Sequence, residues 1–530
     1  MRYPITALMG AVMLAGCGGG SSGDAATGGT TVAPTYTAGV YNDENQYKNY
    51  CASPRSGKSP YTGETYPDRQ GTLMHEQMFL RSWSHRTYLW YRELSDINPA
   101  GYASAEDYFD VLKTSGLSES GAKKDKYHFS EPTSDYEQSN VSQVVGGYGI
   151  EWAIRATKPP RQVYVGYAET GSPADLAGLT RGDLVLTVDG VDVVNGDTQA
   201  VVNSINAGLF PAKVNETHSL SVRTLGGVTK TVQLRSADVN MPLVRNRQVL
   251  TNSKGGKVGY VQFNGFSAPA QADLISAVKQ FSQQGVQDVV LDLRYNGGGS
   301  LALSSQLAYM LSGPNVVQGR LYNRLTFNDK YPNTDPVTGE TLSPIPFYTK
   351  EIDYNAGKLL NTDLPTLTLR RLYVLTTGGT CSASEALVNG LRGVDMEVLL
   401  VGETTCGKPY GFYPTSNCGR TYYSIQFKGS NAKGYGDFFD GLTPATTPAL
   451  NAEVKGCKVT DDFSQPVGSI SEGLLAGALY HSANGSCPVM QQAVAQATEL
   501  ASPVPAVGLG LSIKTSARPL QNEAVIQPIN

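Results

Sequence analysis

The sequence predicts a multidomain α+β protein, and three observations support this class. The chain has 530 residues, whereas single domains usually have about 100–200 residues, so more than one hydrophobic core is needed. Residues 73–94 place apolar side chains at helical spacing, which indicates a helical N-terminal domain. From about residue 245 to residue 403, continuous apolar strands alternate with helices, as in a layered α/β core with parallel strand pairs. The net charge of −4 gives no electrostatic reason to expect nucleic-acid binding.

Residues 1–17 are predicted to form a lipoprotein signal peptide. Arg2 precedes an apolar run over residues 5–15, which is shorter than the about 20 residues that a membrane span needs. A Leu-Ala-Gly sequence then precedes Cys17, and this resembles the bacterial lipobox, whose cysteine takes the lipid. The alternative is an ordinary secretory signal with a chance cysteine. Because Gly18 rather than Asp follows Cys17, the resemblance to bacterial lipoproteins favours anchoring in the outer membrane, facing the periplasm.

Two further segments precede the β-rich part of the chain. Residues 18–38 are rich in Gly, Ser, Thr and Ala and are predicted to form a flexible tether. Residues 39–140 are predicted to form the helical domain, with a second, short helix at 108–112. Two interpretations of this domain stay open: a cap that faces substrate or mediates dimerisation, and a small helical packing domain.

Residues 141–238 resemble a PDZ domain. A strand at 163–167, a short helix at 172–179 and a strand at 184–188 are predicted, with a Gly-Leu-x-x-Gly-Asp sequence between the helix and the second strand. PDZ domains add a peptide strand to a sheet edge and hold its terminal carboxylate on backbone N–H groups. The alternative to this peptide-binding role is a loop that only turns the chain. The residues that match the carboxylate-binding loop in position and composition are Gly147, Tyr148, Gly149 and Ile150.

The third domain is predicted over residues 239–500, and residues 501–530 are a Pro- and Ala-rich tail. Within the domain predicted over residues 239–500, periodic segments alternate between strand and helix, which indicates parallel strands covered by helices. The Tyr-, Asn- and Pro-containing stretch at 314–366 is expected to be irregular. Strands are predicted at 257–263, 286–293, 371–377 and 397–403, and helices at 270–284, 300–311 and 383–391.

A serine lies where a buried strand passes into a helix. The strand at 371–377 ends in two glycines, and the helix begins at Ser382. One interpretation is a helix cap, with Glu385 completing a capping box. The other is a nucleophile, because the first N–H groups of a helix lack helical partners and can point toward a developing oxyanion.

The next strand favours a nucleophile, because it leads into Lys408. Both strands of a β-α-β unit run in the same direction, so Ser382 and Lys408 are expected on the same rim of the sheet. A lysine held beside a serine in an apolar pocket loses proton affinity and can accept the hydroxyl proton. A solvated surface lysine is the alternative. None of the five histidines is positioned to act as the base instead.

A glycine run follows the predicted strand at 286–293 and includes Gly298 and Gly299. Glycine lets the backbone approach a ligand closely. The run is therefore predicted to aim N–H groups at the same site, and a flexible turn is the alternative.

These blocks resemble the carboxyl-terminal processing (tail-specific) peptidase family. They read Leu-Asp-Leu-Arg-x-Asn-x-Gly-Gly, Ser-Ala-Ser-Glu and Val-Gly-Glu-x-x-x-Gly-Lys, and they follow one another in the family's order over about residues 145–415. The resemblance implies a ClpP/crotonase-like α/β peptidase core, substrates with nonpolar C-termini, and no metal or cofactor. It assigns the nucleophile to Ser382, the general base to Lys408, and the oxyanion amides to Ala383, Gly298 and Gly299.

The sequence departs from this family next to the base. Many members have Gln four residues after the lysine, where this chain has Phe412. The third catalytic residue is therefore open. Glu385 is the candidate, and Asn389 lies about one helical turn further along.

Six cysteines remain after Cys17, and an even number in an exported protein makes disulfides plausible. The cysteines nearest to each other in sequence are Cys406 with Cys418 and Cys457 with Cys487. Alternatively, a Cys381–Cys406 disulfide would join the two predicted catalytic loops. The pairing, which also involves Cys51, stays open. Cys381 is disfavoured as a nucleophile because no nearby histidine supports a thiolate.

The sequence thus predicts a lipid-anchored serine endopeptidase of the bacterial cell envelope. It would cleave exported proteins or peptides that its PDZ domain recognises by their C-termini. The alternative is a catalytically silent lipoprotein that binds peptides or apolar ligands through the PDZ domain and the core. The expected partners are a protein or peptide substrate and the membrane, with no nucleic acid. The physiological substrate and the oligomeric state stay open.

Overall fold

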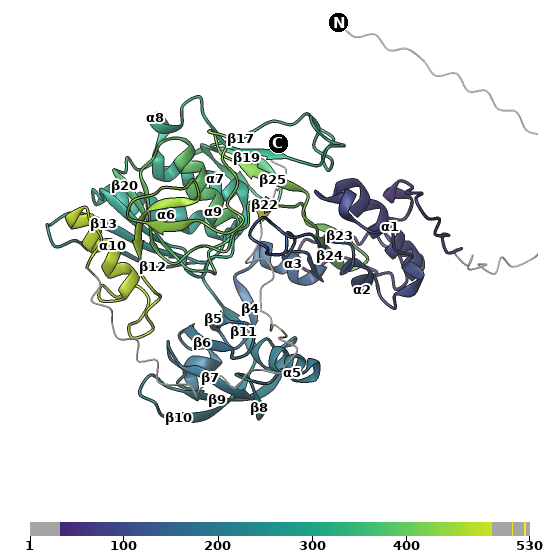
Figure 1. The fold of residues 1–530 in the computed structure, drawn as a ribbon, viewed down its shortest axis with the longest axis horizontal. Coiled ribbons are helices and arrows are strands. Elements are labelled where there is room, and N and C mark those ends of the chain that lie inside the picture. The colour runs from purple at the N-terminus through teal and green to yellow at the C-terminus, as the bar shows by residue number, and fades with distance from the viewer. Residues whose placement is uncertain (1–31, 490–510, 512, 514–523, 526–530) are drawn as a thin grey trace, which may run out of the picture.

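The structure is a computed structural model that describes residues 32–489, 511, 513 and 524–525 (Figure 1). The predicted signal peptide with Cys17, most of the tether and most of the 501–530 tail lie outside the described residues. Within the described ranges, no helix is both long and apolar enough to span a bilayer.

A seven-stranded sheet forms the centre of the largest unit. Its first strand is antiparallel to its neighbour, and the strands from β13 to β26 pair in parallel. The predicted α/β core with parallel pairs is therefore confirmed. The order is β12 (Val244–Thr251), β13 (Lys257–Phe263), β14 (Asp288–Asp292), β20 (Arg371–Thr376), β21 (Val398–Gly402), β27 (Glu453–Lys458) and β26 (Thr443–Ala445).

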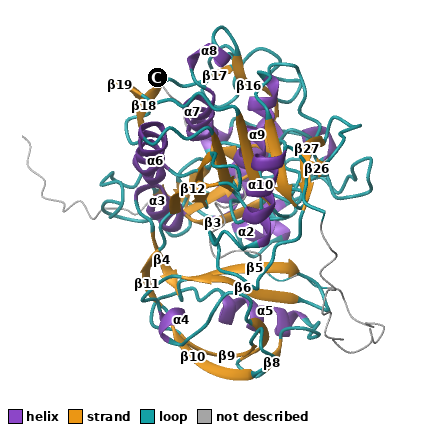
Figure 2. Ribbon diagram, turned by 90° about the vertical axis from the view of Figure 1, so that its left-hand side faces the viewer, coloured by secondary structure: helices purple, strands orange, loops and turns teal. Residues whose placement is uncertain are grey.

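Helices cover both faces of this sheet, as Figures 1 and 2 show. Alternate residues of each strand point to opposite faces: Leu291 and Val374 pack in the larger core, whereas Val290 and Tyr373 pack in the smaller one. Both faces are apolar, which explains the continuous apolar runs in the sequence. Helices α6 (Gln271–Gln283), α7 (Leu301–Ser312) and α9 (Ala383–Gly393) cover the first face, and α10 (Gly473–Asn484) covers the second.

The stretch at 314–366 was expected to be irregular, and this is wrong in part. It contains short elements: β17 pairs with β16, β18 pairs with β19 within the stretch, and β16 also has a partner far along the chain. Strands this short show no clear period in the sequence. Strand β16 pairs with β25, which also pairs with β22. The elements are α8 (Pro314–Val317), β16 (Leu321–Thr326), β17 (Ile345–Pro346), β18 (Lys350–Asp353), β19 (Lys358–Asp363), β22 (Tyr410–Gly411) and β25 (Phe427–Ser430).

A second sheet forms a smaller unit below the first in Figure 2. Its strand order is β10-β9-β7-β6-β5, with β8 on β7, so β5 is an edge strand. The antiparallel pair of β4 (Val144–Gly147) and β11 (Ala237–Asn240) carries the chain into and out of this unit. Its other elements are β5 (Ile150–Ala156), β6 (Gln162–Ala168), α4 (Pro173–Leu176), β7 (Leu184–Val188), β8 (Val191–Asp192), α5 (Gln199–Leu209), β9 (Thr217–Arg223) and β10 (Thr229–Arg235).

The N-terminal segment is built together with a distant part of the chain. Its strand β3 pairs with β24, which pairs with β23, and Cys51 is bonded to Cys418. In Figure 1, α1 and α2 accordingly lie beside β23 and β24. The helix expected within 73–94 ends at Thr87. The elements are η1 (Glu44–Gln46), β1 (Tyr50–Cys51), β2 (Arg69–Gln70), α1 (Leu73–Thr87), η2 (Tyr91–Glu93), η3 (Pro99–Gly101), α2 (Ala105–Phe109), β3 (Phe129–Pro132), α3 (Thr133–Val141), β23 (Thr415–Asn417) and β24 (Arg420–Tyr423).

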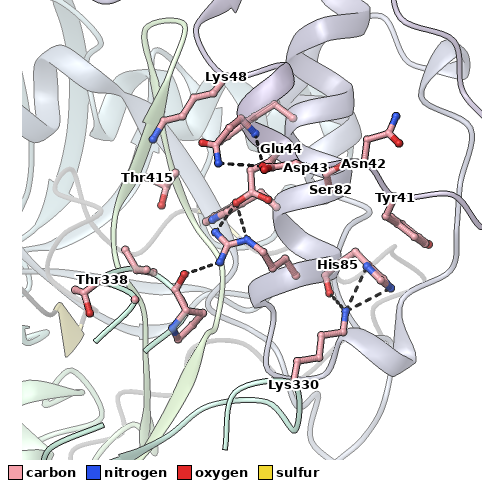
Figure 3. Close-up of a pocket in the computed structure, with 17 residues that line it drawn as sticks. Tyr41, Asn42, Asp43, Glu44, Lys48, Ser82, His85, Lys330, Thr338 and Thr415 are labelled. Atoms are coloured by element: carbon pink, nitrogen blue, oxygen red, sulfur yellow. Dashed lines mark hydrogen bonds and ion pairs between the residues drawn. The ribbon is translucent and has the colours of Figure 1, made fainter. Parts of the chain in front are cut away.

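A hollow of about 650 Å³ lies between this segment and the loop at 336–339 (Figure 3). Arg86 of α1 pairs with Glu44 and donates to the Pro336 carbonyl. Lys330 Nζ donates to the His85 carbonyl at 2.6 Å. These contacts tie the N-terminal segment to the large unit. None of the predicted site residues lines this hollow.

Candidate active site

The turn that carries Ser382 is fastened to the loop after β14. Thr380 Oγ1 donates to the Leu293 carbonyl at 2.8 Å, and the Cys381 amide donates to the Asn296 carbonyl at 3.0 Å. Ser384 Oγ donates to the same Asn296 carbonyl at 3.0 Å. The ends of two adjacent parallel strands therefore hold the start of α9.

Ser382 has φ +58° and ψ −110°, which a residue with a side chain rarely adopts and which occurs at functional sites. A strained strand-to-helix turn of this kind presents the nucleophile in α/β-hydrolases. The side chain is 1% exposed, and Oγ has no hydrogen-bond partner among the described residues. The predicted capping box with Glu385 is present, and its carboxylate half is the hydrogen bond from the Ser382 amide to Glu385 Oε2 at 2.8 Å. The contact of Oγ with the Glu385 amide does not reach hydrogen-bond geometry, so the cap leaves the hydroxyl available as a nucleophile.

Lys408 reaches the same place from the loop after β21. Ser382 and Lys408 line one cavity of about 20 Å³, together with Ala386, Asn389 and Tyr410. This volume is about enough for one water molecule. The structure thus brings the two residues to one rim, as the parallel β-α-β arrangement predicts.

Aromatic rings surround the Lys408 amine. Nζ lies 4.4 Å from the ring centroid of Phe412 and 4.8 Å from that of Tyr127, and the residue is 1% exposed. Phe412, at the position where the family resemblance predicts Gln, therefore supplies a ring face instead of a hydrogen bond. Tyr127, whose hydroxyl donates to the Gly407 carbonyl at 3.1 Å, comes from the N-terminal segment. No motif marks it in the sequence.

Glu385 connects the two loops through its carboxylate. Oε2 accepts from the amides of Ser382 and Lys408, each at 2.8 Å, and Oε1 accepts from the Gly407 amide at 2.9 Å and from Thr405 Oγ1. Burial raises the pKa of this carboxyl, and the four donors act in the opposite direction. Glu385 is thus placed to position the backbone on both sides of the site.

A disulfide joins the same two loops. Cys381, directly before Ser382, is bonded to Cys406, two residues before Lys408. The Cys406 amide also donates to the Thr380 carbonyl at 3.1 Å. Of the pairs that nearness in sequence favours, the structure contains Cys457–Cys487, whereas Cys418 is bonded to Cys51 instead of Cys406.

The predicted oxyanion amides lie on two sides of the site. Ala383 is the first residue of α9, so its N–H has no partner within the helix. The Gly298 amide donates to Asn296 Oδ1 at 2.9 Å and is engaged in this structure. At Gly299, φ is +127° and a Cβ atom would lie 2.2 Å from the Phe266 carbonyl oxygen, so only glycine fits.

A buried ionic network supports the glycine loop, and sequence reasoning missed its partners. Arg294 follows β14 and donates to Asp292, to Asp461 Oδ1 at 2.8 Å and to both carboxylate oxygens of Glu472. Burial opposes the charge on Arg294, but the carboxylates raise its pKa well above the ordinary value. Arg181 of the smaller unit also pairs with Asp461, at 2.7 Å, which links the two units.

The loop predicted to bind a carboxylate lies at the start of the edge strand β5, where Ile150 begins the strand. Tyr148 is buried and its hydroxyl donates to the Gly208 carbonyl of α5 at 3.0 Å. Gly149 has φ +73°, and a Cβ there would lie 2.4 Å from Ser172 Cβ. Gly147, which ends β4, precedes this turn. The loop therefore lies between the edge strand β5 and helix α5.

The described residues contain no group of three or more His, Cys, Asp or Glu side chains that could hold a metal ion.

Parts of this chain match two protein-family models and several known proteases. Residues 257–413 match the model of peptidase family S41, and residues 164–209 match that of the PDZ domain. A carboxyl-terminal-processing protease of a Picosynechococcus species is 30% identical over 241 residues, which are 45% of this chain and 49% of the relative. The chloroplastic carboxyl-terminal-processing peptidase 1 of Arabidopsis thaliana is 29% identical over 237 residues, 45% of this chain and 42% of the relative. The matched region thus spans about half the length of these relatives.

A solved structure shows the same fold over most of the chain. The crystal structure of a protein from Bacteroides fragilis, described as an S41 protease, has a TM-score of 0.56 at 22% identity. The match covers 80% of this chain and 99% of the other.

Proposed function

Because the chain carries a peptidase family S41 domain preceded by a PDZ domain, we propose that it is a serine endopeptidase of the carboxyl-terminal processing type. One observation supports this proposal above the others. The hydroxyl of Ser382 is buried in a left-handed strand-to-helix turn, has no described hydrogen-bond partner, and lines one small cavity with Lys408.

In the proposed reaction, Ser382 Oγ attacks the peptide carbonyl while the neutral Lys408 amine accepts the hydroxyl proton. Lys408 is the proposed base because its buried side chain lines the same small cavity as the Ser382 hydroxyl. Lys408 then returns the proton to the leaving amine, and water hydrolyses the acyl-enzyme in a second, equivalent step. The N–H of Ala383 and those of the Gly298–Gly299 loop would stabilise the oxyanion. The Gly298 amide would first have to exchange Asn296 for the substrate.

The proposed PDZ function is to bind a nonpolar C-terminus of a substrate protein. In the strand order of the described residues β5 is an edge strand, onto which a peptide strand could add, and the 147–150 loop lies at its start. The bound chain would then be held close to Ser382, which raises its local concentration. We also propose, from the lipobox-like sequence alone, that Cys17 carries a lipid that anchors the enzyme in the bacterial outer membrane, facing the periplasm.

The test is cleavage of a disordered protein substrate that ends in nonpolar residues. We expect Ser382→Ala to lower kcat by roughly a thousandfold or more. Ser384→Ala removes the neighbouring hydroxyl and one hydrogen bond, so it should retain most of the activity. A substrate that ends in Asp residues should show a higher KM. Equal cleavage by the wild type and Ser382→Ala would contradict the proposal.

The active-site disulfide is expected to matter for turnover. Cys381→Ala/Cys406→Ala should lower kcat about tenfold to a hundredfold with a smaller effect on KM, because displacement of catalytic groups by about 1 Å can cost a hundredfold. The measurement is steady-state kinetics on the same substrate. Cys457→Ala/Cys487→Ala is the matched control, since it removes a disulfide away from Ser382. Equal losses in both double variants would show that the effect is one of stability alone.

A further inference from the structure

Two described residues of the C-terminal segment, Leu511 and Ile513, lie on the smaller unit between β4 and β11, which contains the PDZ match and is called the PDZ unit below. The Leu511 amide donates to Asp197 Oδ1 at 2.8 Å, just before α5 begins. The Ile513 amide donates to the Thr157 carbonyl at 3.1 Å, just after edge strand β5 ends. The segment therefore contacts the unit between β5 and α5, at the end of β5 opposite the 147–150 loop.

A buried charged group forms part of this contact. Arg161 is 1% exposed and donates to the carbonyls of Thr157, Val193 and Gly196, and its Nη2 donates to the Leu511 carbonyl at 2.7 Å. A buried guanidinium needs such acceptors, because unmade hydrogen bonds are costly. Ile513 is 4% exposed and packs within the apolar core of the PDZ unit.

The same segment reaches the candidate active site. Strand β28 (Ala524–Val525) pairs in parallel with β15 (Gly299–Ser300), in the register Gly299 to Ala524 and Ser300 to Val525. It also contacts β22, which follows Lys408. Thus β28 contacts both the proposed oxyanion loop and the loop after the proposed base, where a substrate strand would lie.

We propose that the C-terminal segment of this chain is an intramolecular competitor of substrate. Leu511 and Ile513 occupy the peptide-binding side of the PDZ unit, and Ala524–Val525 occupy the edge of β15 beside Ser382. The inference deepens the proposed function and rests on it. A segment of the same chain that occupies the substrate sites reduces the fraction of enzyme that can bind substrate. The apparent KM then rises by the inverse of that fraction.

The kinetic test uses the full chain and two pairs of variants. Ile513→Asp places a charge in an apolar core and should release the PDZ contact, whereas Ile513→Val should retain it. Ala524→Pro/Val525→Pro removes the backbone N–H groups that strand pairing needs, whereas Ala524→Ser/Val525→Ser keeps them. If the segment is bound about nine-tenths of the time, release should lower KM about tenfold. An unchanged KM in both disruptive variants would overturn the inference.

A second readout does not depend on activity. In Ser382→Ala protein, hydrogen exchange of the Gly299 amide should be slow with the native segment and faster with the double proline variant. The Ser300 amide donates to the Phe266 carbonyl at 2.7 Å and should exchange equally in both, which makes it an internal control. The double serine variant should match the native segment. Unchanged exchange would overturn the inference. Faster exchange without cleavage by any protein that retains Ser382 would support the inference and contradict the proposed peptidase function.

Discussion

Lys408→Met is expected to lower kcat by roughly 10²–10⁴-fold, the usual contribution of a general acid–base group. Methionine has a similar length and no charge, so it can fill the buried space beside Phe412 and Tyr127. Methionine is flexible and packs well against aromatic rings, so we expect the variant to fold. Single-turnover cleavage and thermal unfolding of the variant would therefore separate a loss of chemistry from a loss of folding.

The matched control for Lys408 is Lys126→Met. Lys126 is exposed, and its Nζ lies 3.5 Å from the Cys406 carbonyl oxygen, so it is a cation near the same loop that takes no part in the proposed chemistry. We expect this variant to stay within about threefold of wild type, because exposed charge contacts are weak. Comparable losses in the two variants would show that positive charge near the site, rather than a base, is what matters.

Glu385→Gln is expected to be nearly as damaging as Glu385→Ala. Each carboxylate oxygen faces two donors, so the NH₂ group of Gln must oppose a pair of donors in either orientation. Leaving buried donors unsatisfied costs about 1–3 kcal/mol each. We expect a lower free energy of unfolding and a kcat reduced about a hundredfold, because both catalytic loops shift. Urea denaturation and steady-state kinetics measure the two effects.

The pH dependence of activity also tests the positioning role of Glu385. Only the carboxylate accepts from all four donors, and burial raises its pKa above that of an ordinary glutamate. As the pH is lowered, activity should therefore be lost at a higher pH than protonation of an ordinary glutamate would predict. In Glu385→Gln, this fall should be missing from the acid limb of the pH–activity profile. Glu403→Gln is the control, since Glu403 forms a partly exposed ion pair with Arg155 on the same rim. An identical acid limb in Glu385→Gln would rule out the positioning role.

Much of the core could be predicted because its signals are local. Buried parallel strands are apolar on both faces, so β13, β14, β20 and β21 are visible as continuous runs in the sequence. The common direction of parallel strands then predicts that Ser382 and Lys408 share a rim, and the structure places both at one cavity. The short strands within 314–366 were missed. Strand β16 pairs with β25, about 100 residues away, whereas β18 and β19 pair locally but are too short to show a period.

Residue type and spacing were sufficient to identify the α/β core, the strand-to-helix turn at Ser382 and the lysine after the next strand, and resemblance to known sequences indicated the PDZ unit. These features depend on the local alternation of apolar residues and on glycines in turns. The four donors around Glu385, the ring of Tyr127 over Lys408 and the Cys51–Cys418 bond depend on segments that meet only after folding. Such contacts reflect packing and hydrogen-bond satisfaction between distant parts of the chain, and no periodicity in one segment encodes its partner in another.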